Sequence, residues 1–199
     1  MFECGYSFTF YTFLIYWFTE CPKSRKGSYG VVWIDGNSVG LGCIGFLPNW
    51  IRKKYQKAVQ YCQKLNTKAH LIEIFNEKQQ NFLMESKVVK KVKKYLGKHY
   101  HSYRNYPANF WLGAELWRSN WYWTHCGKKV KYVPNIHPLD KKYTQAYAYM
   151  SVLSKKSVQW KFDRPQNHYG NQNGGSTQSL MPLCQISTQT RQRSKNLGE

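Results

Sequence analysis

The stretch from Phe110 to Thr124 constrains the fold of this chain more than any other. It reads Phe-Trp-Leu-Gly-Ala-Glu-Leu-Trp-Arg-Ser-Asn-Trp-Tyr-Trp-Thr and holds four of the eight tryptophans. Indole surface is unfavourable to leave in water, so most of it is expected in a core. Trp121 and Trp123 are two residues apart and share one face if they lie on a strand. Gly113 marks a bend or a close approach of another backbone.

The cysteines indicate disulfides and an oxidising compartment. The chain has 199 residues, which suits one domain with appendages. Its six cysteines are dispersed and form no C-x-x-C pair, so a zinc ribbon or a thioredoxin-type site is not expected.

Only 10 Asp and Glu are available for acid–base work, and there is no G-x-S-x-G, H-E-x-x-H or P-loop. The chain is therefore not expected to be an enzyme or to hold a metal site.

Residues 52–83 predict two helices joined by a strand. Between 52 and 65 the apolar residues recur at helical spacing, and Cys62 lies on that apolar face, where a structural disulfide is favoured over chemistry. Residues 69–74 form the strand. Asn76 is the expected N-cap of the second helix, with Gln79 reaching back toward it.

These segments together resemble the C-type lectin-like domain. Trp111-Leu-Gly-Ala and Trp121-Tyr-Trp-Thr-His-Cys-Gly are similar to two motifs of that family, and residues 55–83 are similar to its first helix, strand and second helix. The resemblance runs over residues 50–132. It implies an α+β fold with two helices and small antiparallel sheets, a long ligand loop, and a disulfide between Cys62 and Cys184 that ties the first helix to the last strand.

The domain is expected to span residues 49–186. Residues 1–48 are an apolar segment, either a secretion signal or a strand, followed by a linker. Within them the G-x-G-x-x-G at 40–45 is interpreted as a turn-rich strand connection, because no helix opens at its last glycine. Residues 134–158 depart from the family pattern and are expected to be an inserted loop. The polar, basic residues 187–199 are expected to be a disordered tail.

The loop at 160–174 resembles the family's sugar-binding loop but lacks its carboxylates. By position, Arg164-Pro-Gln166 stands for the family's ligand tripeptide and Gln172 for a calcium-ligating glutamate. Calcium prefers anionic oxygens, whereas a guanidinium offers none and repels the ion. We therefore expect no calcium cofactor. The candidate ligand-binding residues of this loop are Arg164, Gln166, Asn167, Gln172 and Asn173.

Residues 87–104 are the most basic window of a chain with a formal charge of +20. A polyanion would be bound there by lysines that neutralise its charges. A solvated helix face next to a tyrosine-rich loop explains the same pattern. This second interpretation, in which these lysines bind no natural polyanion, is favoured. The candidate polyanion-binding residues are Lys87, Lys90, Lys91, Lys93 and Lys94.

Two binding functions follow, both for a secreted protein with no membrane span. The first is carbohydrate recognition through the 160–174 loop, without a working calcium site. The second is a calcium-independent lectin-like module that binds a protein or an acidic polymer through its basic surface. Specific recognition of nucleic acid is not expected. Sensitivity to EDTA and to salt separates the two.

Overall fold

The tryptophan-rich stretch forms a hairpin of β4 (Ala108–Trp117) and β5 (Asn120–Trp123) in the computed structural model of the protein. The hairpin belongs to a sheet with the order β5-β4-β6-β7, in which β6 is Gln145–Ser154 and β7 is Ser157–Asp163. These four strands are antiparallel, and the short β8 (Met181–Pro182) pairs with β4 in parallel. The structure describes residues 20–24, 30–48, 51–96, 108–132, 145–154, 157–163 and 178–187.

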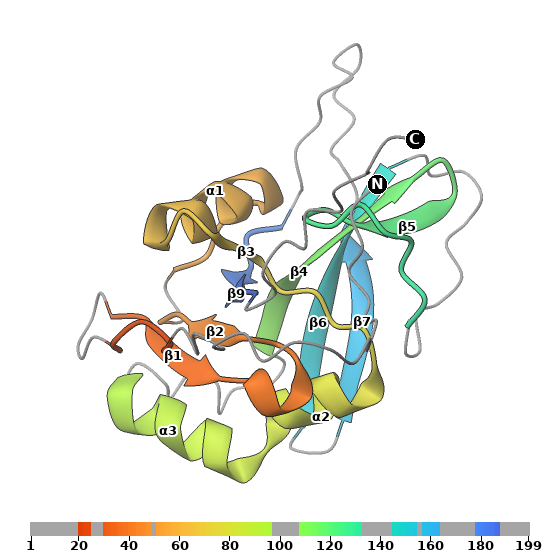
Figure 1. Ribbon diagram of the computed structural model, residues 1–199. Helices are drawn as coiled ribbons and strands as arrows, with labels where there is room; N and C mark the ends of the chain where they lie inside the picture. Colours follow the sequence, from red (N-terminus) through yellow and green to blue (C-terminus); the bar gives the residue numbers. More distant parts are fainter. Residues whose placement is uncertain are drawn as a thin grey trace, which may run out of the picture.

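A second sheet has the order β1-β2-β9-β3 and is antiparallel (Figure 1). Its strands are β1 (Val32–Asp35), β2 (Cys43–Phe46), β3 (Ala69–Leu71) and β9 (Cys184–Ile186). A short 3-10 helix, η1 (Asn37–Val39), connects β1 to β2. Gly40 and Gly42 take positive φ in that connection, so the G-x-G-x-x-G begins in a turn and runs into β2, a turn-rich strand connection as the sequence indicated.

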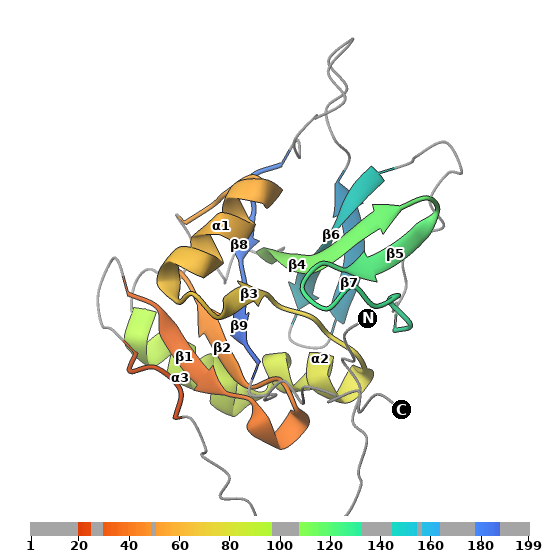
Figure 2. The ribbon, with the colours of Figure 1, turned by 45° about the horizontal axis from the view of Figure 1, so that its top comes forward.

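Three helices pack on these sheets: α1 (Tyr55–Leu65), α2 (Glu77–Met84) and α3 (Ser86–Leu96). Figures 1 and 2 show α1 and α3 on opposite sides of the sheet that contains β1. The predicted N-cap is confirmed, because Asn76 Oδ1 accepts the Gln79 N–H at 2.9 Å. Gln79 reaches back as well, but its Oε1 accepts the N–H of Phe75 at 2.7 Å.

The buried tryptophans among the described residues lie in two hydrophobic clusters. Trp111 packs with Tyr55 and Ala58 of α1, while Trp123 packs with Ile72 and Phe82 toward α2. Both indoles are buried, whereas Trp121, which shares the face of Trp123, is only partly buried. The expected burial is thus confirmed for Trp111 and Trp123.

Gly113 is the point at which β4 meets the chain after β3. Its N–H donates to the Ile72 carbonyl at 2.8 Å. A Cβ at this position would lie 2.7 Å from the Leu71 carbonyl oxygen, closer than real contacts allow. The close approach predicted from the sequence is therefore the reason that glycine stands here.

Two boundaries expected from the sequence were wrong. The domain begins before residue 49, because residues 32–35 and 43–46 form β1 and β2 of its second sheet. Residues 145–154 are not an inserted loop, because they form β6, a central strand. Its tyrosines made the segment look polar, but Tyr147 and Tyr149 pack around Trp111, while Ala148 and Met150 alternate into the other cluster. The segment is therefore a strand buried on both faces.

Candidate functional site

The candidate sugar loop begins where β7 ends. Asp163, the last residue of β7, is buried and accepts the Gln178 N–H at 3.0 Å. Trp160 is buried as well and donates to Gln80 Oε1 at 2.8 Å. These contacts anchor the base of the loop. Its candidate ligand-binding residues lie outside the described residues: Arg164, Gln166, Asn167, Gln172 and Asn173.

The candidate polyanion-binding residues lie on α3. Val88 and Val92 are buried against the rest of the protein, so the helix presents the opposite side to solvent. Four exposed lysines follow that side at spacings i, i+3, i+4 and i+7, and they are named here the lysine face: Lys87, Lys90, Lys91 and Lys94. Of Lys93, the structure describes only its place on the helix backbone.

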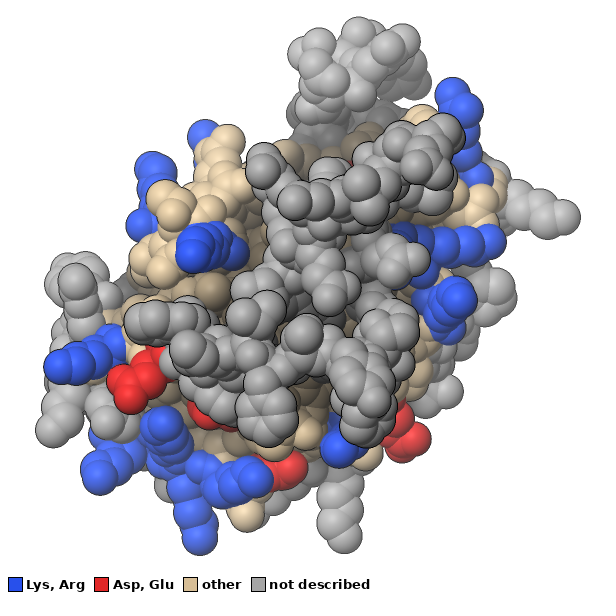
Figure 3. Space-filling model, in the orientation of Figure 1, with Lys and Arg blue, Asp and Glu red and all other residues tan. Residues whose placement is uncertain are grey.

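The lysine face carries excess positive charge. Lys87 forms an ion pair with Glu85 at 2.9 Å and lies over the Phe82 ring at 5.6 Å. Within the described part of the chain, no ion pair is found for the other three lysines of the face. Figure 3 shows Lys and Arg side chains gathered over α3, at the lower left of the molecule. An anion that approaches this helix meets several charges within one Debye length.

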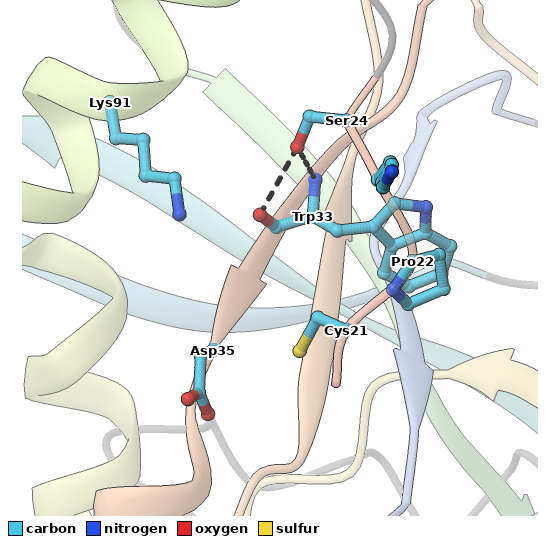
Figure 4. A pocket seen from close by; sticks show the side chains of 7 residues that line it. Cys21, Pro22, Ser24, Trp33, Asp35 and Lys91 are labelled. Atoms are coloured by element: carbon cyan, nitrogen blue, oxygen red, sulfur yellow. Dashed lines mark hydrogen bonds between the residues drawn. The ribbon is translucent and has the colours of Figure 1, made fainter. Parts of the chain in front are cut away.

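A shallow cleft of about 400 Å3 adjoins the lysine face, between α3 and β1. Lys91 extends from the helix toward β1, where Trp33 and Asp35 lie (Figure 4). Ser24 Oγ accepts the Trp33 N–H at 2.9 Å and lies 3.3 Å from the Trp33 carbonyl oxygen, so this hydroxyl fixes residue 24 to the strand. Lys23, next to it, adds a second cation to the cleft. The sequence had placed residues 23 and 24 in a linker and so gave no indication of this role.

A second polar and aromatic surface lies on the β4–β5 hairpin. Trp117 is 58% exposed, and the Arg118 guanidinium lies 4.4 Å from the centre of its ring. A cleft of about 560 Å3 is lined there by Glu115, Trp117, Tyr122, Thr124 and Gly127. The spacing of the tryptophans did not separate Trp117 from the core tryptophans. The signal was the Arg-Ser-Asn that follows it, a hairpin turn that leaves the end of β4 in solvent.

A buried polar cluster lies where the chain after β3 meets the turn after β5. Glu73 is buried and accepts the N–H groups of His125 at 2.9 Å and Cys126 at 3.4 Å. Burial raises the pKa of Glu73 to about 7, although those two N–H groups oppose the shift. His70 stacks on His125 with ring centres 3.8 Å apart.

His70 is held as the neutral imidazole. Its Nδ1 donates to the Leu71 carbonyl at 2.8 Å, so Nε2, at 3.0 Å from Ser187 Oγ, accepts from that hydroxyl. Burial and the neighbouring His125 lower the pKa of His70 to about 4, and the Leu71 carbonyl opposes this. The hydrogen bonds of Glu73 and His70 are made to other groups of the protein, which indicates a structural role for the cluster.

The predicted disulfide between Cys62 of α1 and Cys184 of β9 is present. A second disulfide joins Cys21 to Cys43, and Cys126 is also disulfide-bonded. Among the described residues no cysteine is free. No helix in the described ranges is long and apolar enough to cross a membrane.

Comparison with known proteins adds two solved structures. CEL-IV, a C-type lectin, matches 77% of this chain and 90% of its own, with 14% identity and a TM-score of 0.48. EMS16, an antagonist of the collagen receptor integrin α2β1 and a C-type lectin-like snake venom protein, matches 78% of this chain and 96% of its own, with 15% identity and a TM-score of 0.45. No family model and no curated protein matches the chain. The helices, the two small sheets and the Cys62–Cys184 disulfide nevertheless give the chain the α+β, C-type lectin-like fold that its sequence motifs predict.

Proposed function

We propose that this protein is a secreted lectin-like binding protein that recognises a sulfated or otherwise acidic glycan through the lysine face, without calcium. The observation that carries the proposal is the stripe of exposed lysines on α3, at residues 87, 90, 91 and 94. With a rise of about 1.5 Å per residue, the stripe is about 10 Å long. It can therefore contact several sulfate or carboxylate groups of one extended chain at once.

The affinity comes from charge neutralisation and counterion release. Each lysine that pairs with an anionic group of the polymer displaces condensed cations, so binding weakens as salt is added. The adjoining cleft extends the positive surface through Lys23 and Lys91, and Ser24 supplies a hydroxyl beside them. Lysine suits this role because its ammonium is a compact charge with freely rotating donors.

A sulfated glycan fits this surface better than a single-stranded nucleic acid. Non-specific nucleic-acid sites combine cations with aromatic side chains on which the bases stack. Among the residues that the structure describes, the exposed large hydrophobic side chain is Trp117, and it lies on the hairpin, away from α3 (Figures 1 and 2). Within the described ranges, the lysine face thus offers charge without an exposed tryptophan or phenylalanine on which bases could stack.

Calcium independence rests on the residues of the 160–174 loop. Arg164 brings a cation to a position where calcium would need an anionic oxygen, and Gln172 is neutral where the family pattern has a glutamate. Secretion is supported by the disulfides Cys21–Cys43 and Cys62–Cys184, which persist in oxidising compartments. A binding role, not catalysis, follows from the lack of a constellation of catalytic side chains in the sequence.

The test is titration calorimetry with a heparin octasaccharide at several salt concentrations, from about 50 to about 300 mM, with and without EDTA. The test variant replaces the four lysines of the lysine face by glutamine. The matched control replaces four exposed lysines at the other side of the sheet, on and beside α1, and so removes the same charge: Lys54, Lys57, Lys64 and Lys68.

We expect the lysine-face variant to lose most of the binding and about three to four units of the slope of log K against log salt. The control should keep both, and EDTA should change neither. Equal losses in the two variants would show that only total charge matters and would refute a site on α3. A requirement for calcium would refute the proposed loop chemistry.

A further inference from the structure

The β4–β5 hairpin displays a surface that the proposed function does not use. Trp117, the last residue of β4, is 58% exposed although the other described tryptophans of the stretch are buried or partly buried. On β5, the Tyr122 ring meets the Trp117 ring edge to face, with ring centres 6.5 Å apart. Exposure of so large an apolar side chain is unfavourable in water and is typical of binding surfaces.

The backbone at this tip is strained. Arg118 and Ser119 form the two-residue connection with φ values of 46° and 67°. Two consecutive positive φ angles suit Asn-Gly, and they cost about 1–2 kcal/mol for each residue with a β-carbon. The strained turn places the Arg118 guanidinium 4.4 Å from the centre of the Trp117 ring. A glycine in place of Arg118 would relax the backbone and lose that contact.

Glu115 supplies an acceptor beside the indole. It stands two residues before Trp117 on β4, directly opposite Tyr122, so the three side chains share one face of the hairpin. The Glu115 carboxylate lines the same cleft of about 560 Å3 and has no hydrogen-bond partner among the described residues. Glu115 is half-buried, and this burial raises the pKa of its carboxyl group.

The charges around the ring select the class of ligand. Arg118, which lies over Trp117, repels a cation that Glu115 attracts, and the reverse holds for an anion, so the pair gives neither kind of ion a net attraction. A neutral polyol uses both groups, since its hydroxyls donate to the carboxylate and accept from the guanidinium. An apolar face on the same molecule would cover the indole.

We propose that the hairpin tip is a second, calcium-independent saccharide subsite, in which an equatorially substituted pyranose displaces the exposed Arg118 guanidinium from the Trp117 ring, stacks on that ring and hydrogen-bonds to Glu115 and Arg118. Such a pyranose has axial C–H groups on its faces and hydroxyls around its rim, which matches the distribution of apolar and polar groups in the cleft. This inference is independent of the lysine face, because α3 and the hairpin lie at opposite ends of the molecule (Figures 1 and 2).

The test uses two neutral probes, cellotetraose and chitotetraose, with the full-length protein. Saturation-transfer NMR at about 10 mM sugar detects weak binding, and calorimetry gives the affinity. Trp117→Ala removes the stacking surface, and Trp117→Phe restores part of it. Tyr61→Ala, which truncates a partly exposed aromatic side chain on α1, is the matched control. Circular dichroism confirms that each variant is folded.

We expect at least one probe to bind, with affinity reduced about tenfold or more by Trp117→Ala, less by Trp117→Phe, and not by Tyr61→Ala. Glu115→Gln should weaken binding, since an amide accepts hydrogen bonds less strongly than a carboxylate. Added salt should have no effect, which separates this subsite from the lysine face. Failure of both probes to bind, or equal binding by Trp117→Ala, would overturn the proposal.

Discussion

In the unmodified protein, Glu73 and His70 affect the pH dependence of stability in opposite directions, and the two effects nearly cancel. Replacing Glu73 by glutamine removes one of them and is expected to make the free energy of unfolding depend on pH. Burial raises the pKa of Glu73 from its ordinary value of 4.5 to about 7. The folded state therefore holds a proton that the unfolded chain releases between these values. The contribution of Glu73 is fully present below pH 4.5 and is lost as the pH rises to 7. Glutamine keeps an oxygen for the His125 N–H but does not titrate.

His70 acts in the opposite direction over nearly the same range. Its pKa falls from 6.5 to about 4 because burial and His125 disfavour the charged ring. The unfolded chain therefore binds a proton that the folded protein does not. The contribution of His70 is present above pH 6.5 and is lost as the pH falls to 4. Each shift corresponds to about 3 kcal/mol, so the two slopes nearly cancel in the unmodified protein.

The measurement is urea denaturation followed by tryptophan fluorescence at a series of pH values. The difference in unfolding free energy between Glu73→Gln and the unmodified protein should rise by about 3 kcal/mol as the pH increases from 4.5 to 7. All other titrating groups cancel in this difference. The control is Glu20→Gln, which removes an exposed carboxylate. For this control, the difference in unfolding free energy from the unmodified protein should change by less than about 0.5 kcal/mol over the same pH range. A flat difference for Glu73→Gln would refute the argument from burial.

Three further predictions test the fold. Gly113→Ala should lower the free energy of unfolding by about 1–3 kcal/mol in chemical denaturation, because the new Cβ would meet the Leu71 carbonyl. Gly127→Asn should be tolerated, because Gly127 has a φ of 70° and open space around it. Trp111→Ala should cost about 3–5 kcal/mol; an unchanged melting temperature would contradict its place in the core. Removing both Cys62 and Cys184 opens a loop of 122 residues and should lower the free energy of unfolding by about 4–5 kcal/mol under oxidising conditions. In reductant the unmodified protein also lacks the disulfide, so the two proteins should be equally stable.

The sequence predicted the parts of the fold that depend on local spacing and on strong motifs. The helix that carries Cys62, the N-cap at Asn76 and the close approach at Gly113 are each set by a few neighbouring residues, and each is found in the structure. The pairing of Cys62 with Cys184 came from the family resemblance and was also found. Spacing along the chain could not have supplied that pairing, because 122 residues separate the two cysteines.

The parts that were missed depend on tertiary contacts. Tyr147 and Tyr149 look like loop residues until they are seen against Trp111, which β4 brings beside β6. In the same way, Trp117 differs from Trp123 in its position at the hairpin tip, which the spacing of the tryptophans does not reveal. Exposure and burial of aromatic side chains are thus properties of the assembled sheet.

The position of β9 has a consequence for the order of folding. Cys184–Ile186 pairs with β2 on one side and β3 on the other, so the last described strand lies in the interior of the sheet (Figure 1). While the chain emerges from the ribosome, β2 and β3 have no partner between them, and their facing edges stay open to water until residues 184–186 arrive. Closure of this sheet therefore waits for contacts of large sequence separation, which predicts slow folding. An interruption of synthesis before residue 184 would leave two unpaired strand edges, a template for aggregation.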